Sequence, residues 1–129
     1  MRLLLDTQVA LWWLTGSPRL SKTTRDLLAG SACVLSVASV WEVAIKHRLA
    51  KLPIPPGRFR DEMRSAGATI LALTDDQVVT QVDLPVDHPD PFDRLLIAVA
   101  ASEHLILITA DRTLVALAEV DPRLPIRQA

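Results

Sequence analysis

The sequence has a single cysteine, four glycines and no apolar stretch near the roughly 18 residues that cross a membrane. Cys33 has no partner for an internal disulfide, and the run Cys33-Val34-Leu35 predicts a buried thiol, which suits a reducing cytosol. No glycine-rich phosphate loop is present, which argues against a nucleotide-hydrolysing motor. Asp6 interrupts the first apolar residues, so no signal peptide is expected. We therefore expect a cytoplasmic protein that is neither secreted nor embedded in a membrane.

The chain also lacks an excess of charge of either sign. It carries 14 basic and 15 acidic residues, for a formal net charge of −1, and so has no global positive field of the kind that marks chromatin or ribosomal proteins. Any contact with nucleic acid must come from a local patch. The 129 residues are 50% hydrophobic and 22% charged, which is a globular composition, and we expect one domain spanning residues 1–129.

Short apolar runs alternate with segments of helical periodicity along the chain. Strands are predicted at residues 3–5, 33–35, 69–73 and 105–108, with a proline-containing edge strand at 124–126. Helices are predicted from Asp6 to the break at Ser17-Pro18, from the N-cap Ser21 to Gly30, and at 37–46, about 58–65, 74–82, 92–104 and 111–120. Irregular connectors are expected at 52–57 and around Pro85, Pro89 and Pro91. The alternation implies βαβ crossovers, and therefore an α/β fold with a parallel sheet covered on both faces.

Acidic residues stand where such a fold places its active crevice. Asp6 directly follows the first strand, and Asp111 follows the 105–108 strand, so both fall at the carboxyl edge of the sheet. Asp93 lies in the first turn of the 92–104 helix, and the crossover places it either toward the opposite edge or above the sheet. Glu42 shares the polar face of its helix with Ser39 and Lys46, opposite an apolar face of Val37, Val40, Trp41, Ala44 and Ile45.

Each acid also has a purely structural interpretation. Asp6 and Asp111 could cap the helices that follow them, and the segment Asp90-Pro91-Phe92-Asp93 is close to a capping box. Glu42 and Lys46 have the i,i+4 spacing of an exposed salt bridge. Against that interpretation, Glu42 lies in a densely apolar run, and four separate coincidences would be needed.

The histidines and tryptophans are assigned to structure rather than to the site. His47, His88 and His104 are scattered and Cys33 has no partner at ligand spacing, which argues against zinc, and His47 and His88 are expected at the surface. The helical spacing of the tryptophans favours the core or a subunit interface over stacking on RNA bases; they are Trp12, Trp13 and Trp41.

Four segments together resemble the motifs of PIN-domain ribonucleases, and more narrowly the VapC toxins of bacterial and archaeal toxin–antitoxin pairs. The segments, in chain order, are Leu3-Leu4-Leu5-Asp6-Thr7, Ser36-Val37-Ala38-Ser39-Val40-Trp41-Glu42-Val43-Ala44-Ile45-Lys46, Asp90-Pro91-Phe92-Asp93-Arg94-Leu95-Leu96-Ile97-Ala98 and Ile108-Thr109-Ala110-Asp111. The resemblance spans residues 1 to about 120. It implies a three-layer α/β/α fold around a mainly parallel sheet of four or five strands.

The resemblance also implies a catalytic set and a reaction. Asp6, Glu42 and Asp93 would be metal-ligating acids and Asp111 a fourth, more variable one; Thr7, Ser39 and Thr109 would be polar supports. The sequence departs from close relatives at Gln8, where they often have histidine, and the roles of Gln8 and Asp90 stay open. One or two Mg²⁺ ions, or Mn²⁺, suit carboxylate ligands and would drive hydrolysis of RNA as a metal-dependent endoribonuclease.

Contacts to RNA and proteins are expected at named positions. The RNA candidates are Arg94 and Arg112, which each follow a proposed ligand, and Lys46, in a basic cluster that is equally readable as a solvated helix end. The resemblance implies a VapB-like antitoxin that blocks the acidic groove with an Arg or Lys. It also implies a homodimer. The apolar residues around Trp12, Trp13 and 95–99 are compatible with an isologous interface, and equally compatible with burial within one chain.

The same residues bear on three competing functions. The main alternative is a catalytically silent PIN-like module that binds RNA or protein, against which the intact acidic set counts. A haloacid-type aspartyl phosphatase would need a second acid where Gln8 stands. A receiver-like signalling domain would need an early acid pair and a lysine at a later strand end. The sequence does not name the RNA, its cut site or the metal.

Overall fold

The computed structural model describes residues 1–84, 88 and 90–129. Its sheet has five strands, all parallel, in the order β3-β2-β1-β4-β5. The strands are β1 (Arg2–Leu5), β2 (Ala32–Ser36), β3 (Thr69–Leu71), β4 (Ile106–Thr109) and β5 (Ile126–Gln128). The predicted α/β fold with a parallel sheet is therefore confirmed, and the expected edge strand is present as β5, shifted by about two residues.

The helices lie close to the predicted ranges. They are α1 (Thr7–Thr15), α2 (Lys22–Ala29), α3 (Val37–Arg48), α4 (Pro56–Ser65), α5 (Asp75–Thr80), α6 (Pro91–Glu103) and α7 (Arg112–Val120). The helix predicted at 74–82 is shorter, because it passes at Gln81 into a 3₁₀ turn, η1 (Gln81–Asp83). Of the three prolines assigned to the second connector, Pro91 is the first residue of α6, while Pro85 and Pro89 lie outside the described residues.

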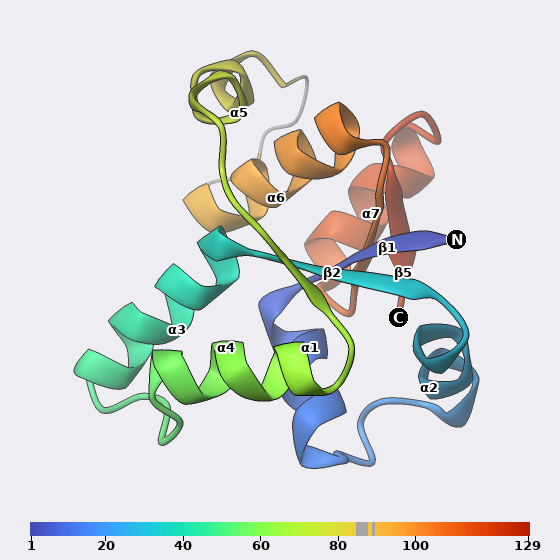
Figure 1. Cartoon of the computed structure of the whole chain (residues 1–129). Coiled ribbons are helices and arrows are strands. Elements are labelled where there is room, and N and C mark those ends of the chain that lie inside the picture. The colour runs from blue at the N-terminus through green and yellow to red at the C-terminus, as the bar shows by residue number, and fades with distance from the viewer. Residues whose placement is uncertain (85–87, 89) are drawn as a thin grey trace.

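Both faces of the sheet carry a hydrophobic core, as β1 illustrates. Leu3 and Leu5 point into a core shared with α1, α2 and α4, whereas Leu4 points into a second core formed with α6 and α7. Figure 1 shows the resulting layers, with α1, α2 and α4 below the sheet and α6 and α7 above it. The run of three leucines is thus fully buried because each face of β1 is covered, as is typical of parallel sheets.

The order of the strands creates a crevice at one end of the sheet. β1 is the middle strand, with β2 on one side and β4 on the other, so the connections that follow β1 and β4 leave the sheet in different directions. The register pairs Leu5 with Ile108, so Asp6 and Thr109 come next to each other at the carboxyl ends. The amide of Asp6 also donates to the carbonyl of Ile108 at 3.0 Å. The first acid of the predicted site is held by this pairing.

Several expectations about burial are now decided. Cys33 is buried, as predicted. Residues 95–99 are buried inside the chain, and Trp12 and Trp13 are half-buried against the first core. Trp41 is 57% exposed, so the core interpretation of this residue was wrong. None of the helices in the part of the chain that the structure describes is long and apolar enough to span a membrane.

Candidate functional site

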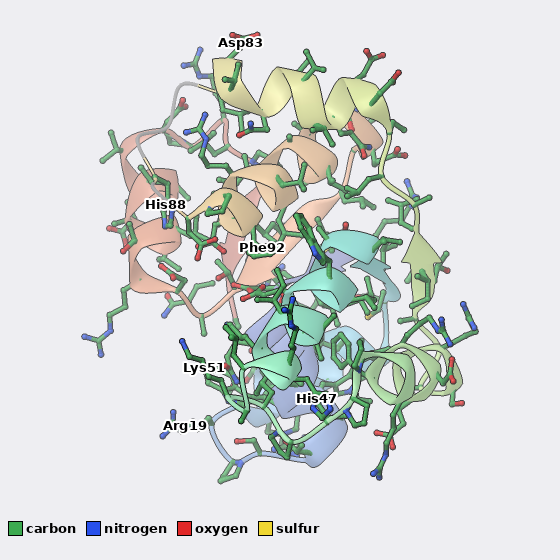
Figure 2. The ribbon with its side chains drawn as sticks, turned by 90° about the vertical axis from the view of Figure 1, so that its left-hand side faces the viewer. Arg19, His47, Lys51, Asp83, His88 and Phe92 are labelled. Atoms are coloured by element: carbon green, nitrogen blue, oxygen red, sulfur yellow. The ribbon has the colours of Figure 1, made fainter. Side chains whose placement is uncertain are left out.

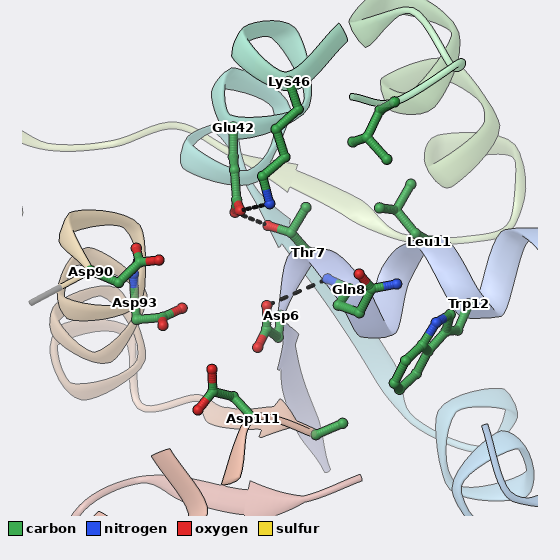
Figure 3. A pocket seen from close by; sticks show the side chains of 12 residues that line it. Asp6, Thr7, Gln8, Leu11, Trp12, Glu42, Lys46, Asp90, Asp93 and Asp111 are labelled. Carbon is green, nitrogen blue, oxygen red and sulfur yellow. Dashed lines mark hydrogen bonds and ion pairs between the residues drawn. The ribbon is translucent and has the colours of Figure 1, made fainter. Parts of the chain in front are cut away.

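The predicted acidic residues meet in one pocket at the carboxyl edge of the sheet. The pocket has a volume of about 310 Å³, which is room for several water molecules at about 30 Å³ each. Its lining includes five carboxylate side chains, those of Asp6, Glu42, Asp90, Asp93 and Asp111. Figure 3 shows that Asp6, Asp93 and Asp111 point toward a common centre, with Glu42 to one side. The sequence placed four of these five acids in the site and left the role of Asp90 open.

Asp6 directly follows β1 and caps α1, and the residue is 8% exposed. Its Oδ2 accepts a hydrogen bond of 2.6 Å from the hydroxyl of Thr109, and its Oδ1 accepts a longer one, of 3.4 Å, from the amide of Gln8. The Gln8 side chain is exposed and lines the same pocket. Asp6 is thus both a helix cap and a pocket residue, so the two interpretations of the sequence do not compete.

Glu42 reaches the pocket from α3 and is held at both oxygens. The hydroxyl of Thr7 donates to Oε1 at 2.7 Å, and the ammonium group of Lys46 lies 2.7 Å from Oε2. Thr7 also forms a hydrogen bond of 2.8 Å with the buried hydroxyl of Ser39. The predicted i,i+4 salt bridge exists, but the Glu42 side chain is only 14% exposed and the pair borders the pocket. Thr7 and Ser39, expected as polar supports, contact Glu42 directly or through one hydroxyl.

The crossover brings Asp93 back to the pocket. The sequence had left two positions open for this residue. Asp90 caps α6, because its Oδ1 accepts from the amides of Phe92 at 2.9 Å and Asp93 at 3.2 Å. The Asp93 side chain is therefore not needed for capping, and it turns toward Asp6 and Asp111 (Figure 3). Asp111 itself caps α7 through the amides of Thr113 and Leu114 while it lines the pocket.

The carboxylates in this pocket are poorly compensated. Burial, followed by the charges of Asp6, Asp90 and the other acids, raises the pKa of Asp93 to about 8. Burial also raises the pKa of Asp6, assisted by the charges of Glu42 and Asp111 and opposed by its hydrogen bonds to Thr109 and Gln8. Lys46 is the one cationic side chain among the described residues that line the pocket. The carboxylates of the site therefore repel one another, and a bound cation would relieve this repulsion.

His88 belongs to this site, and the expectation that it lies at the surface was wrong. The side chain is 7% exposed, and its Nε2 lies 3.5 Å from Oδ2 of Asp93. Ligand atoms of His88, Asp93 and Asp111 all lie within 4.8 Å of one another. Figure 2 shows His88 near the N-terminal end of α6. The available signal was local: His88 stands five residues before Asp93 and two residues before the third motif.

The remaining basic residues differ in how they are held. The guanidinium of Arg94 donates to Oε1 of Gln81 at 3.1 Å and to the carbonyls of Gln81 at 2.5 Å and Val82 at 3.3 Å. Arg94 thus ties η1 to α6. Arg112 is exposed at the start of α7, and within the described parts of the chain its guanidinium has no hydrogen-bond or ion-pair partner. His47 is half-buried, with Nδ1 2.9 Å from the carbonyl of Leu52.

Comparison with known proteins agrees with the fold and with the four motifs. The family model described as the PIN domain matches residues 3–120, so the chain belongs to the PIN domain family. Within that family it is similar to ribonuclease VapC22 of Mycobacterium tuberculosis. The identity is 33% over 116 residues, which cover 86% of this chain and 88% of that protein. The resemblance to VapC-type members is thereby confirmed.

Solved structures share the same architecture. A chain in the crystal structure of VapBC2 from Rickettsia felis, bound to a DNA fragment from their promoter, superposes with a TM-score of 0.68. The match covers 99% of this chain and 98% of that one, at 14% identity. A chain of VapBC-5 from Mycobacterium tuberculosis matches with a TM-score of 0.63 and 21% identity, over 98% and 96% of the two chains. At such identities these likenesses concern the fold.

Proposed function

We propose that this protein is a metal-dependent endoribonuclease that hydrolyses RNA phosphodiester bonds as the toxin of a VapBC-type toxin–antitoxin system. The charge of the pocket carries the proposal. Five carboxylates and one ammonium group line it among the described residues, and the pKa of Asp93 is raised to about 8 by burial and by neighbouring acids. Membership of the PIN family and the similarity to a protein named as a ribonuclease support the choice of reaction.

The donor set fits a hard divalent cation. The four predicted acids offer only carboxylate oxygens as ligands, and Mg²⁺ and Mn²⁺ prefer such oxygens. One or two ions would be held by the carboxylates of Asp6, Glu42, Asp93 and Asp111. Bound there, such an ion would neutralise charge on the phosphoryl oxygens and activate water for attack.

The protein's own residues orient the acids and meet the substrate. Thr109 fixes Asp6 through its hydroxyl, and Thr7 and Lys46 fix the two oxygens of Glu42. Such restraint lowers the entropic cost of gathering several carboxylates around one ion. For RNA, the exposed Arg112 is the best-placed guanidinium for phosphate contacts, since that of Arg94 is bound to carbonyl groups of the chain.

The negative charge of the pocket also supports inhibition by a cationic side chain of a partner protein. A VapB-like antitoxin would block the pocket by placing an Arg or Lys among the carboxylates, in the position of the metal's positive charge. The similar solved structures are described as VapBC or toxin–antitoxin complexes, which supports such a partner. We further infer that the protein is one domain over residues 1–129 and acts in the cytoplasm.

A homodimer is expected to use a surface that shares only Leu95 with the one suggested by the sequence. Residues 95–99 are mostly covered by the chain itself. A mainly apolar groove between α3, α5 and α6 is lined by Trp41, Ile45, Val78 and Phe92, and Trp41 packs edge-on against Phe92. Trp41 and Val78 are 57% and 48% exposed, an arrangement suited to an isologous contact.

Cleavage of total cellular RNA tests the proposed reaction. Wild-type protein freed of antitoxin is compared with Asp6→Asn, with Mg²⁺, with Mn²⁺ and with EDTA, and the new RNA ends are sequenced. Asp26→Asn is a matched control, because Asp26 is an exposed residue of α2 paired with Lys22 and remote from the pocket. We expect discrete, metal-dependent cuts that persist in the control and vanish in Asp6→Asn. A folded wild type that makes no cuts under any of these conditions would favour the silent binding module instead.

A further inference from the structure

The ring of His88 is held between two groups of the third motif. The amide of Asp90 donates a hydrogen bond of 3.1 Å to Nδ1, and Nε2 on the other side of the ring lies 3.5 Å from Oδ2 of Asp93. The side chain is 7% exposed, so protein surrounds the ring and limits its rotation. His88 therefore bridges the start of α6 to one of the acids in the pocket.

The contact with Asp90 determines where the proton of the neutral ring resides. A backbone amide can only donate, so Nδ1 must accept and carries no hydrogen. In a neutral imidazole the hydrogen is then on Nε2, the nitrogen that faces Asp93. The ring thus presents an N–H donor, and not a lone pair, to the carboxylate.

This tautomer bears on metal binding. A ring nitrogen of His88 and carboxylate oxygens of Asp93 and Asp111 all lie within 4.8 Å of one another, a spacing that could otherwise hold an ion. A histidine that binds a metal through one nitrogen donates the other N–H to a carbonyl or carboxylate. Here the other nitrogen faces a donor, the Asp90 amide, so the arrangement needed for a metal ligand is reversed.

We propose that His88 is a positioning residue, which directs an Nε2–H toward Oδ2 of Asp93 and thereby orients this carboxylate, and that it is not itself a ligand. Its role in metal binding rests on the proposed function. Asp90 holds both partners of this contact in place. Its amide donates to the His88 ring, and its side chain caps α6 at the amides of Phe92 and Asp93. The donor leaves the other oxygen of Asp93 for the ion.

Nitrogen NMR of the histidine rings tests the contact directly, without any enzyme activity. Spectra of ¹⁵N-histidine-labelled protein are recorded without metal, with Mg²⁺ and with Zn²⁺, and the signals of His88 are assigned by their loss in His88→Asn. We expect Nε2–H in all three states. A metal-free ring with its proton on Nδ1, or a ring that moves its proton from Nε2 to Nδ1 when an ion is added, would overturn the proposal.

Two substitutions separate the two nitrogens. His88→Asn can still accept from the Asp90 amide but does not reach Asp93, whereas the longer amide of His88→Gln brings an N–H to the position of Nε2. We expect His88→Asn to weaken Mg²⁺ binding by about 10-fold or more, and His88→Gln to restore most of the loss. Imidazole ligands favour Zn²⁺ over Mg²⁺, so the loss of a histidine ligand would weaken Zn²⁺ binding more. Because His88 is not a ligand in this proposal, each substitution should weaken the binding of the two ions by the same factor.

A second histidine provides the control. His104 ends α6 in the left-handed conformation, with φ 56°, which asparagine tolerates, and its side chain is exposed. His104→Asn should leave the affinity unchanged, and circular dichroism verifies that each variant is folded. Wild-type affinity in His88→Asn, or a selective loss of Zn²⁺ in His88→Gln, would contradict the positioning role. A wild type that binds no ion would refute the proposed metal site, while the NMR experiment would still decide the Asp93 contact.

Discussion

The hydroxyl of Thr109 donates a hydrogen bond of 2.6 Å to Oδ2 of Asp6, across 103 positions of the sequence. The same hydroxyl oxygen accepts from the amide of Asp111 at 3.0 Å. Thr109 is fully buried at the end of β4, beside the end of β1. One hydroxyl thus joins two of the acids at the ends of the neighbouring strands β1 and β4.

Replacing this threonine should damage both the site and the fold. Thr109→Val keeps the shape and the strand preference but leaves the Asp6 oxygen and the Asp111 amide without their partner. We expect the free energy of unfolding to fall by about 1–3 kcal/mol, and RNA cleavage to fall by about 10-fold or more at equal folded protein. Urea unfolding and initial cleavage rates measure the two effects.

Thr69→Val is the matched control for this change. Thr69 lies on the edge strand β3 with its side chain exposed, so a loss of its hydroxyl should change neither quantity appreciably. If Thr109→Val behaved like this control, the bond between β1 and β4 would have no role in holding Asp6.

Asp93 should lower the stability of the metal-free protein at neutral pH. Its pKa is about 8 in the folded state and 3.8 for an unperturbed Asp. Between these values the folded state holds a proton that the unfolded chain has lost, so the free energy of unfolding falls as pH rises. Asp93→Asn removes this penalty, and we expect it to stabilise the protein by about 1–2 kcal/mol at pH 8.

The gain should shrink toward pH 4 and level off above pH 8, which distinguishes charge relief from a general packing effect. Urea unfolding in EDTA at several pH values measures it. The exposed, salt-bridged Asp26 offers a control, because Asp26→Asn removes a favourable pairing with Lys22 and should give no such gain. A pH-independent difference between Asp93→Asn and the wild type would refute the assignment.

Metal binding should show the converse dependence on pH. A divalent ion must displace the proton that the folded protein holds on Asp93 below about pH 8. We expect the affinity for Mg²⁺ to rise by about tenfold per pH unit up to that value and then to level off. Calorimetry in two buffers of different ionisation enthalpy measures the affinity and the released proton together. Affinity that does not change between pH 6 and 8 would mean that Asp93 is not the displaced group.

The two arginines that follow the acids should behave differently. Arg94→Met removes a guanidinium that donates to the carbonyls of Gln81 and Val82, and should cost about 1–3 kcal/mol of stability. Arg112→Met should change stability by no more than about 0.5 kcal/mol. It should instead weaken RNA binding and reduce the slope of log affinity against log salt by about one.

Unfolding curves and binding to RNA over a series of salt concentrations, in a cleavage-deficient Asp6→Asn background, provide the comparison. Each arginine variant is the control for the other, since both lie directly after a proposed ligand in sequence. An Arg112→Met variant with an unaltered salt slope would remove Arg112 from the RNA surface.

The sequence allowed a good prediction of the elements, because helices and strands depend on local patterns. Ser21 caps α2 through the amide of Thr24, and Gly30 ends the same helix, at the expected positions. The strand predicted at 69–73 ends at Leu71 and the edge strand is shifted by about two residues, but the larger departure is the 74–82 helix. Its last residues form η1, where the guanidinium of Arg94, on another helix, donates hydrogen bonds to the carbonyls of Gln81 and Val82. These contacts join residues 13 and 12 positions apart and have no signature in the local pattern.

The candidate site was predictable only in part, for the same reason. Asp6 follows β1 directly and Asp111 follows β4 after one residue, so their place at the carboxyl edge could be derived from the order of elements. Asp93 follows a long connector, and only the crossover shows that it turns toward Asp6. His88 was misplaced because a lone histidine among prolines has no periodicity from which burial can be inferred.

The sequence by itself determined the alternation of strands and helices, the parallel sheet that follows from it, and the helix-capping acids at its carboxyl edge. All of these depend on periodicity and on neighbours within a few residues. The i,i+4 pair of Glu42 and Lys46 was also readable from the sequence, but only the tertiary structure decided the other partners of the acids: Thr109 for Asp6, Thr7 for Glu42 and His88 for Asp93. These partners come from different parts of the chain, and their contacts exist only once the strand order and the crossovers have brought those parts together.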